Sequence, residues 1–319
     1  MARNALFQRE ALDILVARQP RISGSGRPVT LFSYSYAALE LFREAKKRGW
    51  NTVLGQIDPG PGEDAIVRRL RAEHPEWTDS GTASPPESYW EMWREECSLA
   101  DRIVVNSSWS RSLLVDAGID YSKIEVVPLA YEDKDRGKLV ASGLPHDDLR
   151  NPYSDTHPLK VLWLGQVIVR KGIHDLAAAA RSVGEGCCRI DVVGPHSTLP
   201  AGLPGNLVFH GPVPRSQASE WYARADVFVL PTHSDGFALT QLEAMAHGLP
   251  VIATPCCGDV VVDGVNGWLV PPGTPEALAG LIRRILEEPE VLEKMRVAAI
   301  ETAAKFRLET VVEALVMTK

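Results

Sequence analysis

Two acidic residues, Asp235 and Glu243, lie eight positions apart in the stretch HSDGFALTQLEAMAHGLP, residues 233–250. The apolar run VFVL just before it is typical of a β-strand, and the spacing of the later leucine, methionine and alanine residues predicts a helix that stops near Gly248. Glu243 falls on the apolar face of that helix. A carboxylate on an inward face needs hydrogen-bond donors, and either two ribose hydroxyls or a buried lysine or arginine could supply them.

Two strand-to-helix junctions have features of anion sites. In the first, the backbone from Gly236 to Leu239 begins the predicted helix, so it offers unpaired N–H groups to a ligand that glycine lets approach closely. In the second, LGQVIVRKGIHDL (164–176), Arg170 and Lys171 precede a helix. Cations at a helix N-terminus are mildly unfavourable because they oppose the helix dipole. They become favourable when an anion binds between the cations and the backbone N–H groups of the helix. Taken alone, this second junction is better explained by two solvated charges in a loop than by an anion site.

Composition limits the class of protein that the chain can be. The 319 residues are 45% hydrophobic and 24% charged with a net charge of −7, which is typical of a soluble protein of two domains and argues against nucleic-acid binding. No apolar run reaches the ~18 residues of a membrane span, and the first twenty residues predict an amphipathic helix instead of a signal peptide. Five cysteines without a CxxC spacing indicate a reduced, cytoplasmic protein without a zinc site.

Strand-like and helix-like segments alternate along the chain, which predicts an α/β fold of doubly wound parallel sheets. The predicted strands are 29–34, 52–57, 102–106, 124–128, 160–165, 189–194, 207–211, 227–231 and 250–254. The predicted helices include 37–47, 87–99, 173–182, 216–224 and 275–287. The polar segment 146–158 is the expected domain boundary. Because the first half has four strands and a helical pattern before them, we expect its domain to lack its first βα unit.

Several motifs, in a consistent order, make the chain resemble the GT-B retaining glycosyltransferases, and most closely glycosyltransferase family 4. DGFALTQLEAMAHGLPV resembles the family's Glu-x7-Glu motif, and GQVIVRKG resembles its G-R-x4-K-G pattern. The similarity also covers WYARADVFVLPT and DGVNGWLVPPG in the second half, and ECSLADRIVVNSSWSRSLLVDAG in the first. The resemblance implies two Rossmann-like domains that face a cleft: 1–150 on the acceptor side and 158–305 for the nucleotide sugar. A helix at 306–319 would cross back to the first domain.

The resemblance also implies roles for individual residues. Glu243 would bind the donor ribose, Lys171 the diphosphate, and Asp235 the sugar hydroxyls near the reacting carbon. The remaining donor-binding positions are the turn at Gly236, the amides of Phe237, Ala238 and Leu239, the main chain of Val213 beside the nucleobase, Gln166 where the family often has arginine, and Arg170 as its compensating cation. In the first domain, Asp58, with Gln56 beside it, lies where relatives place a residue that faces the sugar.

The reaction implied is retaining, metal-independent transfer from a nucleotide sugar, linked to UDP or GDP, to a hydroxyl of a glycan, lipid-linked or small-molecule acceptor. We expect no other cofactor, no nucleic-acid partner and no transmembrane segment, while peripheral membrane contact is compatible with the sequence. The D-x-D pair Asp133 and Asp135 is interpreted as solvated surface. His174, His210, His233 and His247 are interpreted mainly as loop or cap residues, of which His233 is the one to test.

Three departures from the family pattern leave a second function open. Asp235 stands in place of glutamate, Ala238 replaces the motif's second glycine, and no Gly-rich loop follows the first predicted strand. A non-catalytic GT-B-like protein that binds nucleotide or serves as a partner subunit is therefore the alternative to an active transferase. A GT-B-shaped epimerase or phosphorylase would need a different set of active-site residues.

Overall fold

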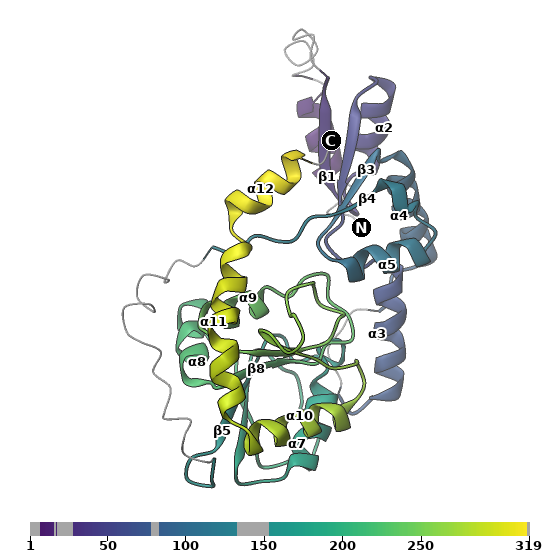
Figure 1. Cartoon of the computed structure of the whole chain (residues 1–319). Coiled ribbons are helices and arrows are strands. Elements are labelled where there is room, and N and C mark those ends of the chain that lie inside the picture. Colours follow the sequence, from purple (N-terminus) through teal and green to yellow (C-terminus); the bar gives the residue numbers. More distant parts are fainter. Residues whose placement is uncertain (1–6, 16, 18–27, 78–82, 133–152, 318–319) are drawn as a thin grey trace. The chain divides into compact units, whose positions relative to one another are not determined.

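The computed structural model describes residues 7–15, 17, 28–77, 83–132 and 153–317 (Figure 1). The chain divides into two compact units, one of residues 1–64 and 83–127 and the other of residues 65–82 and 128–319. The predicted boundary at 146–158 lies largely outside the described residues, and the predicted domain limits stay predictions. In the part of the chain that the structure describes, no helix is both long and apolar enough to span a bilayer.

The first unit contains a four-stranded parallel sheet, and its strand order follows the sequence. The strands are β1 (Thr30–Tyr34), β2 (Asn51–Gly55), β3 (Arg102–Val105) and β4 (Ile124–Val126). Between them run α2 (Leu39–Lys47), α4 (Glu87–Leu99) and α5 (Ser108–Asp116), and the 3-10 turn η1 (Tyr121–Lys123) precedes β4. The helix α3 (Pro61–Glu73) begins in this unit, while its residues from Ala65 onward belong to the second. The four predicted strands are confirmed to within about two residues at their ends.

The second unit contains a six-stranded parallel sheet in the order β10-β9-β8-β5-β6-β7. Its strands are β5 (Leu159–Leu164), β6 (Cys188–Val193), β7 (Leu207–Gly211), β8 (Val227–Leu230), β9 (Val251–Ala253) and β10 (Gly267–Leu269). Its helices are α7 (Ile173–Val183), α8 (Ala218–Arg224), α9 (Leu239–Ala246), α10 (Pro275–Glu287), α11 (Glu290–Lys305) and α12 (Leu308–Met317), with 3-10 turns η2 (Val169–Lys171) and η3 (Arg215–Gln217). The α/β fold with two parallel sheets is confirmed.

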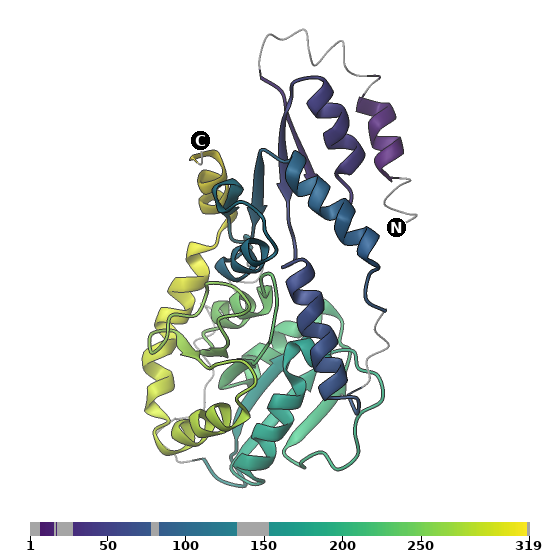
Figure 2. The ribbon, with the colours of Figure 1, turned by 90° about the vertical axis from the view of Figure 1, so that its right-hand side faces the viewer.

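Helices cover both faces of the second sheet, which explains why its strands are apolar on both sides. One core cluster buries Val161, Trp163 and Ile190 of the sheet against α7 and α10, and Figures 1 and 2 show these two helices side by side. The other cluster buries Phe228 and Leu242, in a region where α11 packs against α9. The short strand β10 was not among the predicted strands.

A buried carboxylate fixes the turn that joins β1 to α2. Both oxygens of Glu96, a residue of α4 that is 2% exposed, accept backbone N–H groups at the start of α2: Oε2 from Tyr36 at 2.7 Å, and Oε1 from Ala38 at 2.9 Å and Leu39 at 3.1 Å. Tyr36 has a φ of 69°, and its ring stacks on Tyr89. The helix end that a Gly-rich loop would leave open to an anion is therefore filled by a side chain of the protein.

We predict that Glu96→Gln lowers the free energy of unfolding by about 1–3 kcal/mol, because the amide group must replace one accepting oxygen and leave a buried N–H without an acceptor. Urea or thermal denaturation followed by tryptophan fluorescence measures this change. The neighbouring variant Glu95→Gln is the control, since Glu95 forms a half-exposed ion pair with Arg43 and should cost less than about 1 kcal/mol. Equal costs for the two variants would contradict a capping role for Glu96.

Candidate functional site

The order of strands in the second sheet places a ligand position at the ends of two neighbouring strands. From β5 the chain proceeds to β6 and β7 on one side, then returns to β8, β9 and β10 on the other. In open parallel sheets, ligands bind beyond the carboxyl ends of the strands at such a reversal. The two segments that follow β5 and β8 are residues 165–172 and 231–238, and they contain both of the junctions that the sequence singled out.

A glycine brings these two segments into contact. Gly172, between η2 and α7, has a φ of 72°, a left-handed conformation that disfavours other residues. A Cβ atom at this position would lie 1.8 Å from the carbonyl oxygen of Pro231, the residue that follows β8. Only glycine therefore allows the start of α7 to approach the end of β8 this closely.

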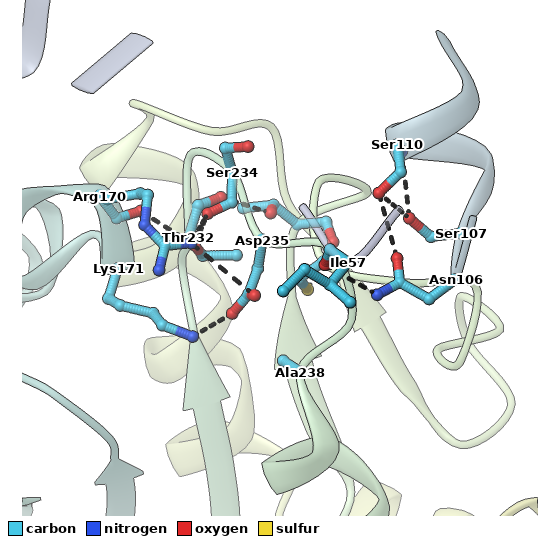
Figure 3. Close-up of polar contacts among 12 residues, drawn as sticks. Ile57, Asn106, Ser107, Ser110, Arg170, Lys171, Thr232, Ser234, Asp235 and Ala238 are labelled. Carbon is cyan, nitrogen blue, oxygen red and sulfur yellow. Dashed lines mark hydrogen bonds and ion pairs between the residues drawn. The ribbon is translucent and has the colours of Figure 1, made fainter. Parts of the chain in front are cut away.

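Hydrogen bonds join the same segments on both sides of that contact. The carbonyl oxygen of Arg170 accepts from the backbone N–H of His233 at 2.9 Å and from the hydroxyl of Thr232 at 2.9 Å. In return, the Arg170 guanidinium donates to the carbonyl oxygen of Ser234 at 2.6 Å (Figure 3). The Arg170 side chain is thus held by the backbone of the segment after β8, without a ligand.

Three charged side chains converge where the segments meet. Lys171 forms an ion pair with Oδ2 of Asp235, and a guanidinium nitrogen of Arg170 lies 3.7 Å from Oδ1 of the same carboxylate (Figure 3). Each of these side chains is at most 20% exposed. The structure therefore brings together the three residues assigned to diphosphate and sugar, with two cations against one anion. Their roles toward a ligand stay predictions.

Backbone carbonyl groups of adjacent cysteines hold the turn before α9. Asp235 N donates to the carbonyl oxygen of Cys256 at 2.7 Å, and Ala238 N donates to that of Cys257 at 3.0 Å. The Ala238 amide, one of three assigned to a ligand, is therefore already used within the protein. Among the described residues, no partner contacts the amides of Gly236, Phe237 and Leu239. The sequence analysis treated the cysteines only as small residues and missed this support, because any residue type has a carbonyl group.

The inward carboxylate of Glu243 has a donor that neither sequence alternative included. The hydroxyl of Tyr222 on α8 donates to Oε2 at 2.8 Å, while Oε1 lies 3.8 Å from the guanidinium of Arg215, whose side chain is 90% exposed. Burial, followed by the charge of Glu243, raises the pKa of Tyr222 well above its usual value, so this hydroxyl stays a donor. The expected buried lysine or arginine partner is thus replaced by a tyrosine, and the ion pair at Oε1 is a loose one at the surface.

Two further predicted donor residues lie in the second unit without a polar side-chain contact. Val213, between β7 and η3, is half-buried against the cluster that contains Phe228 and Leu242. Gln166, just after β5, is exposed. The burial of these residues does not indicate a ligand, so the nucleobase contact of Val213 stays a prediction.

Asp58 belongs to the first unit, where it organises the turn between β2 and α3. Its Oδ1 atom accepts from the hydroxyl of Tyr36 at 2.6 Å, the backbone N–H of Gly60 at 2.7 Å and the amide of Gln56 at 3.1 Å. The indole N–H of Trp93 in turn donates to Gln56 at 2.9 Å. Burial and then the charge of Asp58 raise the pKa of Tyr36. Asp58 thus has a structural role within its own unit, and its catalytic role stays a prediction.

The histidines occupy less exposed positions than expected. His174 and His233 are buried, and with Asp175 they form a group whose possible metal-ligating atoms all lie within 4.8 Å of one another. His210 bonds to Asp191 at 2.7 Å, and His247 is also buried. Asp133 and Asp135 lie outside the described residues.

Comparison with known proteins gives a family for part of the chain. Residues 158–288 match the family of group 1 glycosyl transferases. A D-inositol 3-phosphate glycosyltransferase of Streptomyces griseus is 37% identical over 115 residues, which are 35% of this chain and 24% of that protein. A protein of the same name from Xylanimonas cellulosilytica is 33% identical over 161 residues, 46% of this chain and 38% of that protein. The matched segments thus span about a quarter to two fifths of these relatives.

Solved structures share the fold over most of the chain. The sucrose-phosphate synthase of Thermosynechococcus elongatus superposes with a TM-score of 0.65 at 20% identity and covers 95% of this chain and 75% of that one. HepE of Anabaena in complex with UDP-glucose gives a TM-score of 0.62 at 18% identity and covers 90% and 78%. The α/β fold with two parallel sheets therefore matches the GT-B fold.

We predict that Gly172→Ala lowers the free energy of unfolding by more than about 3 kcal/mol, because the methyl group would overlap the Pro231 carbonyl in addition to straining the backbone. Gly264 is the matched control, since it has the same positive φ, 72°, but has no atom within 4 Å of an added Cβ. Gly264→Ala should cost only about 1–2 kcal/mol of backbone strain. Chemical denaturation of both variants measures the difference, and similar losses would refute the proposed close approach.

Proposed function

We propose that the chain, whose residues 158–288 form a group 1 glycosyl transferase domain, transfers a sugar from a nucleotide-sugar donor to an acceptor hydroxyl with retention of configuration. The observation that carries the proposal is the arrangement of Lys171 and Arg170 at the start of α7, at the point where the strand order reverses. A diphosphate is the donor group that needs two cations and a helix N-terminus.

Charge accounts for why an anion suits this site. Asp235 balances one of the two neighbouring cations, so a net positive charge remains in a region that is largely shielded from water. Helix N-termini add partial positive charge from α7 and α9. The departing nucleoside diphosphate gains negative charge as its bond to the sugar breaks, and fixed cations stabilise that charge without reorganisation. The proposed leaving-group stabilisation therefore comes from Lys171 and Arg170 and needs no metal ion.

The ribose is assigned to Glu243. Tyr222 holds Oε2 in place, and among the described residues Oε1 has only the exposed and distant Arg215. A pair of ribose hydroxyls can donate to such an oxygen more favourably than a solvated guanidinium at 3.8 Å. Arg215 would then move aside or turn toward the phosphates, and Val213, two residues before it, would border the nucleobase.

The sugar of the donor is assigned to the turn between β8 and α9. In this proposal Asp235 accepts sugar hydroxyls near the reacting carbon while it keeps its contact with Lys171, and the amides of Gly236, Phe237 and Leu239 face the sugar or the distal phosphate. UDP-glucose is the first donor to test, because HepE, whose structure shares this fold, is described in complex with it. The acceptor class is open among glycans, lipid-linked molecules and small molecules.

One observation favours the non-catalytic alternative. Asp235 is a residue with a shorter side chain than the glutamate of the family motif, and it is paired with Lys171. If both of its oxygens stay turned toward Lys171 and Arg170 when a ligand binds, the chain would hold a nucleotide while no carboxylate oxygen accepts from the sugar. Nucleotide binding that is unchanged in Asp235→Ala, together with no donor hydrolysis or transfer, would support a binding protein.

We predict that Lys171→Met lowers kcat/KM for donor turnover about 100- to 1000-fold, the usual cost of one lost charge-stabilising group. The measurement is UDP release from a panel of UDP- and GDP-sugars, with and without acceptors. Lys294→Met, an exposed lysine on α11, is the control and should leave turnover unchanged. A wild-type chain that binds no nucleotide would exclude both readings of the site.

We predict that Glu243→Gln weakens the binding of the free nucleoside diphosphate about 10- to 100-fold, because a hydrogen bond to a charged acceptor contributes about 1.5–3 kcal/mol. Isothermal titration calorimetry with UDP and GDP measures the effect, with exposed Glu287→Gln on α10 as control. Unchanged affinity would show that Glu243 accepts a hydrogen bond from Tyr222 and does not contact the nucleotide.

A further inference from the structure

His174 is a buried side chain, and neither nitrogen of its ring has a hydrogen-bond partner among the described residues. It is 7% exposed, lies in the first turn of α7, and its Nδ1 atom is inaccessible and has no partner. The oxygen facing its other nitrogen, Nε2, is Oδ2 of Asp175 at 3.6 Å, beyond hydrogen-bonding distance. A buried polar group left unpaired costs about 1–3 kcal/mol, and such a group in a folded protein often marks the place of an ion or ligand.

A second imidazole and a carboxylate lie beside it. His233, in the segment after β8, places its Nε2 atom 2.6 Å from the same Oδ2 atom of Asp175. The rings of His174 and His233 are 22° from parallel with centroids 5.1 Å apart. All three side chains are buried, and the group is contained in the second unit. Two imidazole nitrogens and one carboxylate oxygen thus face one small volume.

We propose that His174, Asp175 and His233 bind one divalent transition-metal ion, with Zn²⁺ as the best fit, and leave a fourth coordination position for water. Zinc–ligand bonds of about 2.0–2.2 Å place two ligands of a tetrahedral site about 3.4 Å apart. The observed 3.6 Å between His174 and Asp175 already matches that separation. The hydrogen bond from His233 to Asp175 must lengthen by about 0.8 Å to admit the ion.

The donor set decides which ions fit. Two nitrogens and one carboxylate suit Zn²⁺ and Co²⁺, whereas Mg²⁺ and Ca²⁺ prefer oxygen ligands. Each imidazole binds a metal in its neutral form, through the lone pair of its unprotonated nitrogen. The other titratable groups that face His174 are His74, whose ring centroid is 3.9 Å away, and Glu76. In the metal-free chain Nε2 of His233 donates to Asp175, and when Nε2 binds the ion the imidazole proton lies on Nδ1 instead.

The ion would join the two segments that carry the charged site. Asp175 lies four residues after Lys171, and His233 lies two residues before Asp235. A metal ion that links them would hold the start of α7 against the end of β8 from behind the Lys171–Asp235 pair. The ion would have a structural role and take no part in sugar transfer. The proposal is therefore compatible with the expectation that the reaction itself is metal-independent. The proposal also holds if the chain binds a nucleotide without turnover.

The test is metal binding by the whole chain after removal of metals with a chelator. Titration with Co²⁺ should give visible d–d absorption that saturates at one ion per chain, and Zn²⁺ should displace it and raise Tm. His174→Asn should abolish the absorption and the Zn²⁺-dependent rise in Tm. Because the buried ring of His174 packs against those of His74 and His233, this variant without metal is its own baseline, and the compared quantity is the rise in Tm on adding Zn²⁺.

His210→Asn is the matched control, since His210 also bonds to an aspartate, Asp191 at 2.7 Å, but has no second histidine beside that carboxylate. This variant should bind Co²⁺ like the wild type. The proposal is overturned if the stripped wild-type chain binds neither ion at micromolar concentration. It is equally overturned if His174→Asn still binds one ion. If that remaining binding ends when the cysteines are alkylated, the ion is bound by thiolates and not by the proposed site.

Discussion

The buried contact of Lys171 and Arg170 with Asp235 is the constraint on which the rest of the site depends. Two cations and one carboxylate are held with little access to water, so each requires the others to offset the cost of desolvation. The backbone enforces this proximity, because Gly172 allows α7 to begin against the Pro231 carbonyl, and hydrogen bonds of Arg170 join the same segments. The positive charge left over is the basis of the proposal that the site binds an anion.

Much of the fold could be predicted from the sequence because apolar runs and helical periodicity are local signals. The helices 87–99 and 275–287 agree with α4 and α10 at both ends, and all nine predicted strands exist. The three-residue strand β10 was missed, since its pairing with β9 and not its own composition makes it a strand. The carboxylate of Glu96 at the start of α2 was equally hidden, because the residues it joins are about sixty positions apart.

The site shows the same division between local and distant information. The sequence placed Lys171 and Asp235 after two predicted strands, and the resemblance assigned both to the donor, but the direct ion pair between them was not predicted. It forms because β5 and β8 are neighbours in one parallel sheet, whose strand ends share an edge. The partner of Glu243 did not follow from the sequence either, since Tyr222 belongs to another helix and tyrosine also suits a purely apolar position. Nor could the sequence indicate that carbonyl groups of Cys256 and Cys257 support the turn before α9. The type of a residue does not indicate which backbone N–H group will donate to its carbonyl oxygen.

The two substitutions within the family motif have different physical consequences. Ala238 has φ −88° and ψ 98°, which any residue adopts, so the missing glycine costs the backbone nothing here, and the Ala238 amide is used by Cys257. Asp235 is different, because a side chain one methylene shorter keeps its carboxylate close to Lys171 and Arg170. In the proposed function, a donor sugar must therefore come to the carboxylate near the phosphates. We expect the substitution to limit the positions that the reacting carbon can take, and to constrain the sugar more than the nucleotide.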